Sequence, residues 1–193
     1  MTPEQIITRQ LSTWKVPRAY QELRLEDLHP SVLQAIPDSA ISDALRGQFP
    51  ASIGICGIAR ADRAFAALVR QSMESYITAH PEVLDDEDRP VKRQVLWISW
   101  TALFGELVMA DAWSEEFKAT ASIFDRMENV KVLILTGLGD TPDKPERFEA
   151  AIKGVLTRRS SEGLRTYWES PLSLKELQAR YGRTGIVTEA KHG

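Results

Sequence analysis

The stretch that most constrains the fold of this chain runs from Ala51 to Leu68 and reads ASIGICGIARADRAFAAL. Its short apolar run, Ser52 to Cys56, is typical of a buried strand. Gly54 and Gly57 predict a turn, and the alanine-rich residues after them predict a long helix from Ala61 to Ala79. A strand, a glycine turn and a helix in this order indicate an α/β fold, in which strands alternate with helices.

The glycine turn has the spacing of a phosphate-binding loop. The P-loop pattern G-x-x-x-x-G-K-[ST] places a lysine on the phosphates and a hydroxyl on Mg²⁺. With Gly54 in the first slot, the second glycine, the lysine and the hydroxyl are replaced by Ala59, Arg60 and Ala61. Ala61 has no oxygen for a metal, and Ala59 adds a Cβ where backbone must approach phosphate closely. The sequence thus predicts a changed remnant of a nucleotide site.

The rest of the chain continues the alternation. Apolar runs predict further strands at Gln94–Ser99, Lys131–Leu135 and Leu164–Trp168. Helices are expected at Ser31–Leu45 with a break at Pro37, Thr101–Ala110, Ser114–Met127, Pro145–Ser160 and Leu172–Tyr181, with Ser173 and Glu176 forming a capping box. Ile186 and Val187 could add a last strand or helix. This order predicts a mainly parallel sheet flanked by helices on both faces. Residues 1–15 are expected to be a short lead-in of one or two helical turns, and residues 16–193 a single domain.

Composition narrows the class of protein. The 193 residues are 43% hydrophobic and carry a net charge of -3, which suits one globular domain and gives no overall basic field for nucleic acid. The single cysteine, Cys56, excludes an internal disulfide. No apolar run reaches the ~20 residues of a membrane span, and the first residues do not form a signal peptide. We expect a cytoplasmic protein with no membrane partner.

Four stretches resemble one family in the same order. They are VPRAYQELRLEDLHP, VLWISWTALFGEL, NVKVLILTGLGDTPDKPERFEAAIKGVLTRR and GLRTYWESPLSLKELQARYG. Together with the glycine loop, they resemble DnaC/DnaI-type helicase loaders and IstB-type transposition ATPases over roughly residues 16–188. The resemblance implies a P-loop NTPase fold of the AAA+ type. The apolar character of the strand at Ser52–Cys56 predicts a central place in the sheet, and the resemblance implies that the Walker B-like strand lies beside it.

The departures from that family bear on activity. Where the family has two acidic residues after the Walker B strand, this chain has Thr136 and Gly137. Ser170–Pro171 stands at the sensor position, and Thr188–Glu189 stands where loaders carry an arginine finger. Phosphoryl transfer needs the metal, the phosphate clamp and the water-positioning group together. We therefore expect a pseudo-ATPase that is not an enzyme and holds no cofactor or metal. The resemblance implies a protein partner: a replicative helicase, a loader-like ATPase, or a second copy of the chain.

Two other functions stay open. Arg60 could bind an anion at the helix start, which would make the chain an unconventional ATP-binding loader, or it could pair with Asp62 or Asp140. A basic stretch could bind nucleic acid or could be a solvated helix face; it comprises Arg147, Lys153, Arg158, Arg159 and Arg165.

Several further residues have ordinary structural explanations. The acidic run Asp85–Asp88 beside His80 fits a solvated loop better than a metal site, and Cys56 fits a small buried side chain better than a nucleophile. Trp97 is expected in the core, whereas Trp100 and Trp113 could stack on bases.

Overall fold

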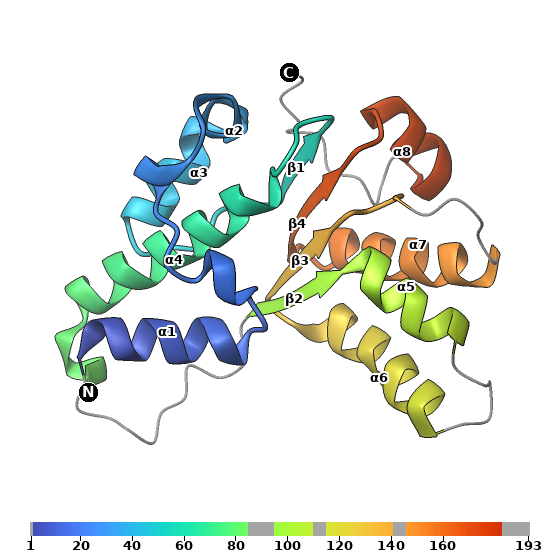
Figure 1. The fold of residues 1–193 in the computed structure, drawn as a ribbon, viewed down its shortest axis with the longest axis horizontal. Coiled ribbons are helices and arrows are strands. Elements are labelled where there is room, and N and C mark those ends of the chain that lie inside the picture. The colour runs from blue at the N-terminus through green and yellow to red at the C-terminus, as the bar shows by residue number, and fades with distance from the viewer. Residues whose placement is uncertain (1, 85–94, 110–114, 141–145, 183–193) are drawn as a thin grey trace.

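Four parallel strands form the centre of the computed structural model, which describes residues 2–84, 95–109, 115–140 and 146–182 (Figure 1). The strands are β1 (Ile53–Cys56), β2 (Val95–Ser99), β3 (Val132–Thr136) and β4 (Arg165–Ser170). They lie in the order β1-β4-β3-β2, and each neighbouring pair is parallel. The predicted parallel sheet is confirmed.

The expectation that the Walker B-like strand, β3, lies beside β1 was wrong. Tyr167 of β4 pairs with Ile53 of β1 on one side and with Ile134 of β3 on the other, so β4 separates the two strands. Within the described residues β1 is an edge strand. The local sequence could not show this, because strand order depends on pairing between residues far apart along the chain. Ile186 and Val187 lie outside the described residues.

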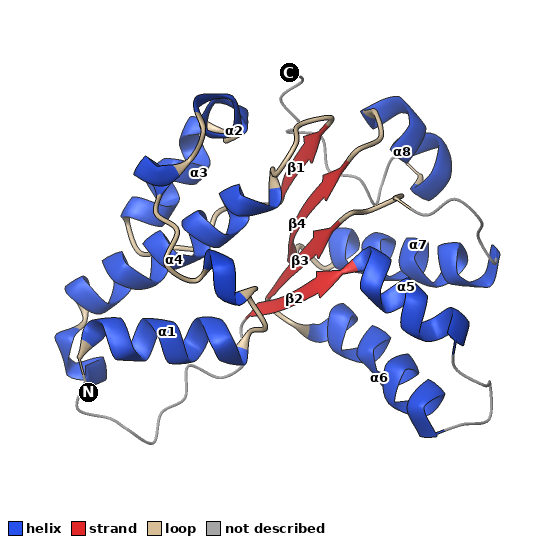
Figure 2. Cartoon of the chain, in the orientation of Figure 1, coloured by secondary structure: helices blue, strands red, loops and turns tan. Residues whose placement is uncertain are grey.

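The helices cover both faces of the sheet (Figure 2). Alternate strand residues point to opposite faces. Ile55, Trp97 and Ile134 pack with one group of helices, which comprises α1 (Pro3–Thr13), α2 (Pro30–Ala35), α3 (Asp38–Leu45) and α4 (Asp62–Ala79). Ile98 and Leu135 face the other group, which comprises α5 (Trp100–Met109), α6 (Glu115–Asn129), α7 (Glu146–Ser161) and α8 (Leu174–Tyr181).

Most predicted helices occur close to their expected bounds. Pro37 separates α2 from α3, and the Ser173–Glu176 capping box at the start of α8 is present. Short 3₁₀ turns lie at Arg18–Tyr20, Leu25–Asp27 and Pro81–Leu84. No helix in the described ranges is long and apolar enough to cross a membrane.

Helix α1 is longer and more deeply packed than the expected lead-in. A capping box at Thr2 starts its 11 residues, and Ile7, Leu11 and Trp14 are buried in the same cluster as the sheet. The carbonyl of Trp14 also accepts a hydrogen bond from the N–H of Trp97 at 3.1 Å. Because β2 is the other edge strand of the described sheet, this bond covers part of that edge.

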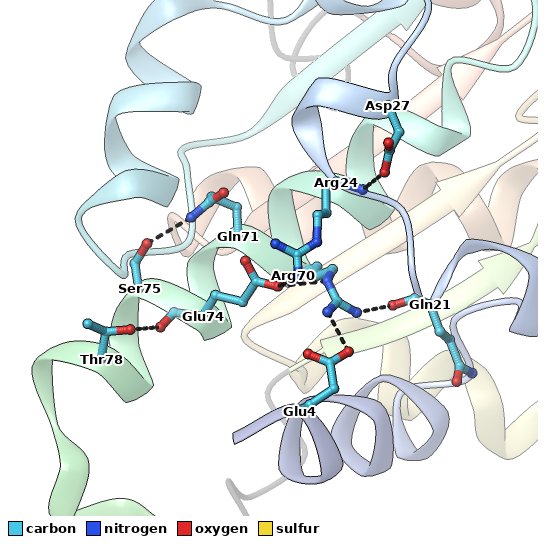
Figure 3. Close-up of polar contacts among 9 residues, drawn as sticks. All are labelled: Glu4, Gln21, Arg24, Asp27, Arg70, Gln71, Glu74, Ser75 and Thr78. Atoms are coloured by element: carbon cyan, nitrogen blue, oxygen red, sulfur yellow. Dashed lines mark hydrogen bonds and ion pairs between the residues drawn. The ribbon is translucent and has the colours of Figure 1, made fainter. Parts of the chain in front are cut away.

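A buried arginine joins α1 to the rest of the domain (Figure 3). Arg70 of α4 is only 2% exposed. Its guanidinium donates to Glu4 of α1 at 2.6 Å, to the carbonyl of Gln21 at 2.5 Å and to Glu74 at 2.8 Å. Arg24 lies 3.6 Å from the same Glu74. Buried charges are tolerated when they are paired and hydrogen-bonded, and Arg70 meets both conditions.

Candidate functional site

The glycine loop lies at the carboxyl edge of the sheet, where α/β proteins usually bind ligands. Strand β1 ends at Cys56, and Gly57 follows with φ +66° and donates its N–H to the carbonyl of Ser170 at 2.9 Å. Arg60 also has a positive φ of +62°, which costs a non-glycine residue about 1–2 kcal/mol. Helix α4 begins at Asp62, and its cap residue Ala61 offers no side-chain hydrogen bond.

The expectation that Gly54 opens the turn was wrong, because Gly54 lies inside β1. Its missing side chain serves packing: a Cβ there would lie 1.9 Å from Cζ2 of Trp168 on the neighbouring strand. The sequence pattern could not reveal this contact, since the two residues are 114 positions apart. The turn itself therefore starts at Gly57.

The end of β3 also lies at this edge. Thr136 is buried and is the last residue of the strand. Gly137 follows with φ +70°, and its N–H donates to Oε1 of Glu169 on β4 at 2.5 Å. Burial raises the pKa of the Glu169 carboxyl, the bond from Gly137 opposes this effect, and the charges of Asp62 and Asp140 add to it. Glu169 was not among the residues predicted from the sequence.

The loop after β3 is fastened to its neighbours. Leu138 donates its N–H to the carbonyl of Glu169 at 3.0 Å and accepts from the hydroxyl of Ser170 at 2.5 Å. Arg180 of α8 donates to the carbonyl of Gly139 at 2.9 Å. These bonds join β3, β4 and α8 and use main-chain groups that face this edge.

Two arginines of the loop region differ in their surroundings. Arg60 is exposed, and the described residues provide it with no ion pair, so the expected pairing with Asp62 or Asp140 is not found. Arg63, in the first turn of α4, lies over the ring of Tyr20 at 5.6 Å from its centroid. Burial raises the pKa of Tyr20, and the charge of Asp62 raises it further, which places all three groups together. Arg63 was also not among the residues predicted from the sequence. It takes the lysine position of the P-loop pattern when the spacing is counted from Gly57 in place of Gly54.

Comparisons with known proteins agree with this architecture. No protein-family profile and no curated protein matches the sequence. Among solved structures, the crystal structure of DnaI superposes with a TM-score of 0.54 at 19% sequence identity, covering 86% of this chain and 80% of DnaI. The chain has the fold of DnaI. A candidate primosome component from Streptococcus pyogenes serotype M3 matches with a TM-score of 0.56 at 16% identity, covering 94% of this chain and 92% of that protein.

The DnaI-like fold confirms the predicted class of parallel sheet flanked by helices. At these identities the likeness concerns the fold alone. The activity of this chain therefore has to be argued from its own residues.

The residues of the basic stretch have different environments in the structure. Arg159 is 0% exposed, so it belongs neither to a nucleic-acid-binding face nor to a solvated helix face, the two alternatives that the sequence left open. Its guanidinium donates to the carbonyls of Met127, Val130 and Arg165 at 2.5–2.7 Å and to the hydroxyl of Thr166 at 3.0 Å. Burial lowers its pKa to about 10, and the charge of Glu162 opposes this effect. Arg159 is a structural cation that binds α6, α7 and β4 together.

The other members of the stretch do not form one surface. Arg158 is paired with Glu128 and Glu162. Lys153 is exposed on α7, and Arg165 is exposed at the amino end of β4. The side chain of Arg147 lies outside the described residues. Helical periodicity alone could not show that one of two adjacent arginines would be buried.

The remaining candidates have ordinary environments. Burial raises the pKa of the Cys56 thiol, which disfavours the reactive thiolate. No group of acidic, histidine or cysteine side chains in the described ranges is arranged to hold a metal ion. Trp97 is buried as predicted, and Trp100 is 1% exposed, so Trp100 cannot stack on a base without unfolding. Trp113 and Asp85–Asp88 lie outside the described residues.

Proposed function

We propose that this chain is a catalytically inactive, helicase-loader-like protein that acts by binding another protein in DNA replication or recombination. The DnaI-like fold supports the helicase-loader-like part of this proposal. The inactivity rests chiefly on the end of β3, where Thr136 and Gly137 stand in place of acidic residues.

The glycine loop supports the same conclusion in the register that the structure favours. A P-loop lies between a strand and a helix. Because β1 ends at Cys56 and α4 begins at Asp62, Gly57 takes the first glycine slot, and Asp62, Arg63 and Ala64 take the last three. Asp62 brings a negative charge to the place where phosphate would lie. Arg63 contacts Tyr20, and Ala64 has no hydroxyl for Mg²⁺.

Glu169 is a poor substitute for the missing acids. Burial raises the pKa of this carboxyl and so disfavours the ionised form that a magnesium ligand needs. Its Oε1 already accepts the N–H of Gly137. The Glu169 carboxyl therefore orients the main chain of the loop after β3. Strand β3 itself offers no carboxylate for Mg²⁺.

Thermal unfolding with and without ATP–Mg tests the inactivity. A ligand that binds only the folded state at a hundredfold excess over its Kd stabilises it by about 2.7 kcal/mol, which would raise the Tm by several degrees. We expect no change at millimolar ATP–Mg. The triple variant Asp62→Gly, Arg63→Lys, Ala64→Ser restores the loop but not the acids on β3, and should bind weakly without hydrolysis. Wild-type turnover that Arg63→Ala abolishes would show that the chain is an enzyme.

Affinity capture from a host lysate, followed by reconstitution with the purified partner, tests the protein-binding part. We expect a replicative helicase or a loader-like ATPase, and sedimentation of the chain alone reports whether the partner is a second copy. Recovery of neither replication nor recombination proteins, together with a monomer at all concentrations, would remove the support for this function.

A further inference from the structure

A cavity of about 500 Å³ opens at the amino edge of the sheet, opposite the glycine loop. It is lined from α3, from the segment that enters β1, and from the turn between α7 and β4. The lining residues that carry the argument are Asp43, Phe49, Ser52, Ser160, Gly163 and Arg165. Ligand sites in proteins are typically ~300–1,000 Å³, so the volume suits a small organic group.

The walls of this cavity are held by buried hydrogen bonds. The hydroxyl of Ser52 accepts the N–H of Thr166 at 3.0 Å, and the hydroxyl of Tyr167 donates to the carbonyl of Pro50 at 3.0 Å. Arg159 donates to the carbonyl of Arg165 at 2.5 Å, which fixes the start of β4. A site whose walls are fixed before binding loses little entropy when a ligand enters.

Opposite charges stand in the lining without pairing to each other. Arg165 has no ion-pair partner in the described ranges, and Asp43 lies 3.5 Å from Arg46, itself largely exposed. Burial raises the pKa of the nearby Tyr167 hydroxyl; the charge of Arg165 lowers it and that of Asp43 raises it, so both lining charges lie near this buried residue. The anionic group of a ligand would pair with Arg165, and a donor group of the same ligand would share Asp43 with Arg46.

The remaining lining adds shape to this charge pattern. Ser52 and Ser160 add two serines to the lining, and a Cβ on Gly163 would meet nothing within 4 Å, which leaves room for close approach to its backbone. Phe49 is half-buried and supplies a flat apolar wall. The carboxylate of Asp43 only accepts hydrogen bonds, so it suits a donor group of a ligand. The guanidinium of Arg165 matches the geometry of phosphate, so it suits the anionic group.

We propose that this cavity binds a single nucleotide unit whose base carries an exocyclic amino group, with the phosphate on Arg165 and the amino group on Asp43. One nucleotide combines an anion, a planar ring for Phe49 and a donor edge within the size of the cavity. The unit could come from a free mononucleotide or from a single strand, since both present the same groups. The inference does not depend on the proposed function, because Arg60 and Arg63 lie at the opposite edge.

A ¹H–¹⁵N NMR titration with dCMP, dTMP and deoxycytidine tests the assignment. Cytosine presents an amino donor where thymine presents a carbonyl acceptor, and one good base contact discriminates by roughly tenfold or more. We expect shifts at the amides of residues 48–52 and 160–165, with dCMP bound about tenfold more tightly than dTMP. Arg165→Gln should remove the advantage of dCMP over deoxycytidine. Asp43→Asn should narrow the preference for dCMP over dTMP, because an amide can both donate and accept.

Two control variants and a single-stranded oligonucleotide complete the experiment. Lys153→Gln removes an exposed cation of α7 outside the lining, and Arg60→Gln removes one at the other edge; both should leave dCMP binding unchanged. Tighter, salt-dependent binding of an oligo-dC would assign the site to a single strand, and equal or weaker binding would assign it to free nucleotides. Absence of shifts at millimolar dCMP, or binding that survives both Arg165→Gln and Asp43→Asn, would overturn the proposal. A shift produced by an acidic peptide alone would also overturn it.

Discussion

The two edges of the sheet are completed in different ways. At the carboxyl edge, Gly57, Gly137 and Leu138 direct main-chain N–H groups onto Ser170 and Glu169 of β4. At the amino edge, Arg159 satisfies the carbonyls beneath the surface, and a cavity lined by Asp43 and Arg165 remains above them. The polar groups at the edge where this architecture usually binds ligands are thus bonded to one another, while at the opposite edge Arg165 has no ion-pair partner among the described residues.

The amino edge can be broken most severely through Arg159. Arg159→Met removes the donors to four carbonyls and one hydroxyl and leaves those buried or part-buried acceptors without them. Each buried acceptor left without a donor costs about 1–3 kcal/mol, so we expect a loss of about 3–5 kcal/mol in urea unfolding, together with loss of the cavity. Arg158→Met, at the exposed neighbouring position, should have a far smaller effect. Equal effects of the two substitutions would show that the buried bonds do not stabilise this edge.

Gly54→Ala tests the packing contact between β1 and β4, two strands that run from the amino edge to the carboxyl edge. The new Cβ would lie 1.9 Å from the indole of Trp168, so the strand or the ring must move. Overpacking of this kind costs about 1–3 kcal/mol, and we expect the upper end of that range by urea unfolding. Gly154→Ala is the matched control, since its Cβ would meet nothing within 4 Å on helix α7, and it should stabilise by about 0.5–1 kcal/mol. A neutral Gly54→Ala would mean that Trp168 repacks freely.

Arg60→Gly sharpens the account of the carboxyl edge. The positive φ of Arg60 is strained for a side-chain-bearing residue and ordinary for glycine. Relief of the strain, partly offset by the flexibility of glycine in the unfolded chain, should raise the stability by about 0.5–1 kcal/mol. Lys15 has a similar φ of +62° after α1, so Lys15→Gly should behave alike in the same thermal melts. A destabilised Arg60→Gly would show that the arginine side chain makes a contact that stabilises the loop.

Glu169→Gln has the smallest expected effect and a defined pH dependence. Because the folded-state pKa of Glu169 is raised, mainly by burial, its ionisation weakens the folded state as pH rises above the ordinary pKa of a glutamate. Glutamine keeps an acceptor for the N–H of Gly137 without the charge. The variant should therefore melt higher than the wild type at pH 7, and the difference should vanish below the unfolded-state pKa of the carboxyl. A variant that is less stable at pH 7 would indicate that the ionised bond to Gly137 outweighs the cost of burial.

Local patterns in the sequence determined the element types and their order along the chain. Strands appear where apolar runs are bounded by turn residues, the break at Pro37 follows from its missing N–H, and the Ser173–Glu176 cap depends on residues three apart. The parallel arrangement also followed, because each strand is connected to the next through helices.

Tertiary structure decided the features that depend on residues far apart in sequence. Trp168 turned Gly54 from a presumed turn residue into a packing contact, and β4 entered the sheet between β1 and β3. Arg158 and Arg159 read alike in the sequence, yet only Arg159 is buried and donates to acceptors of α6, of the residue Val130 that follows it, and of β4. Pairing across the sheet and the burial of a charge are set by partners that local periodicity does not contain, which is why the edges and their chemistry emerged only from the folded chain.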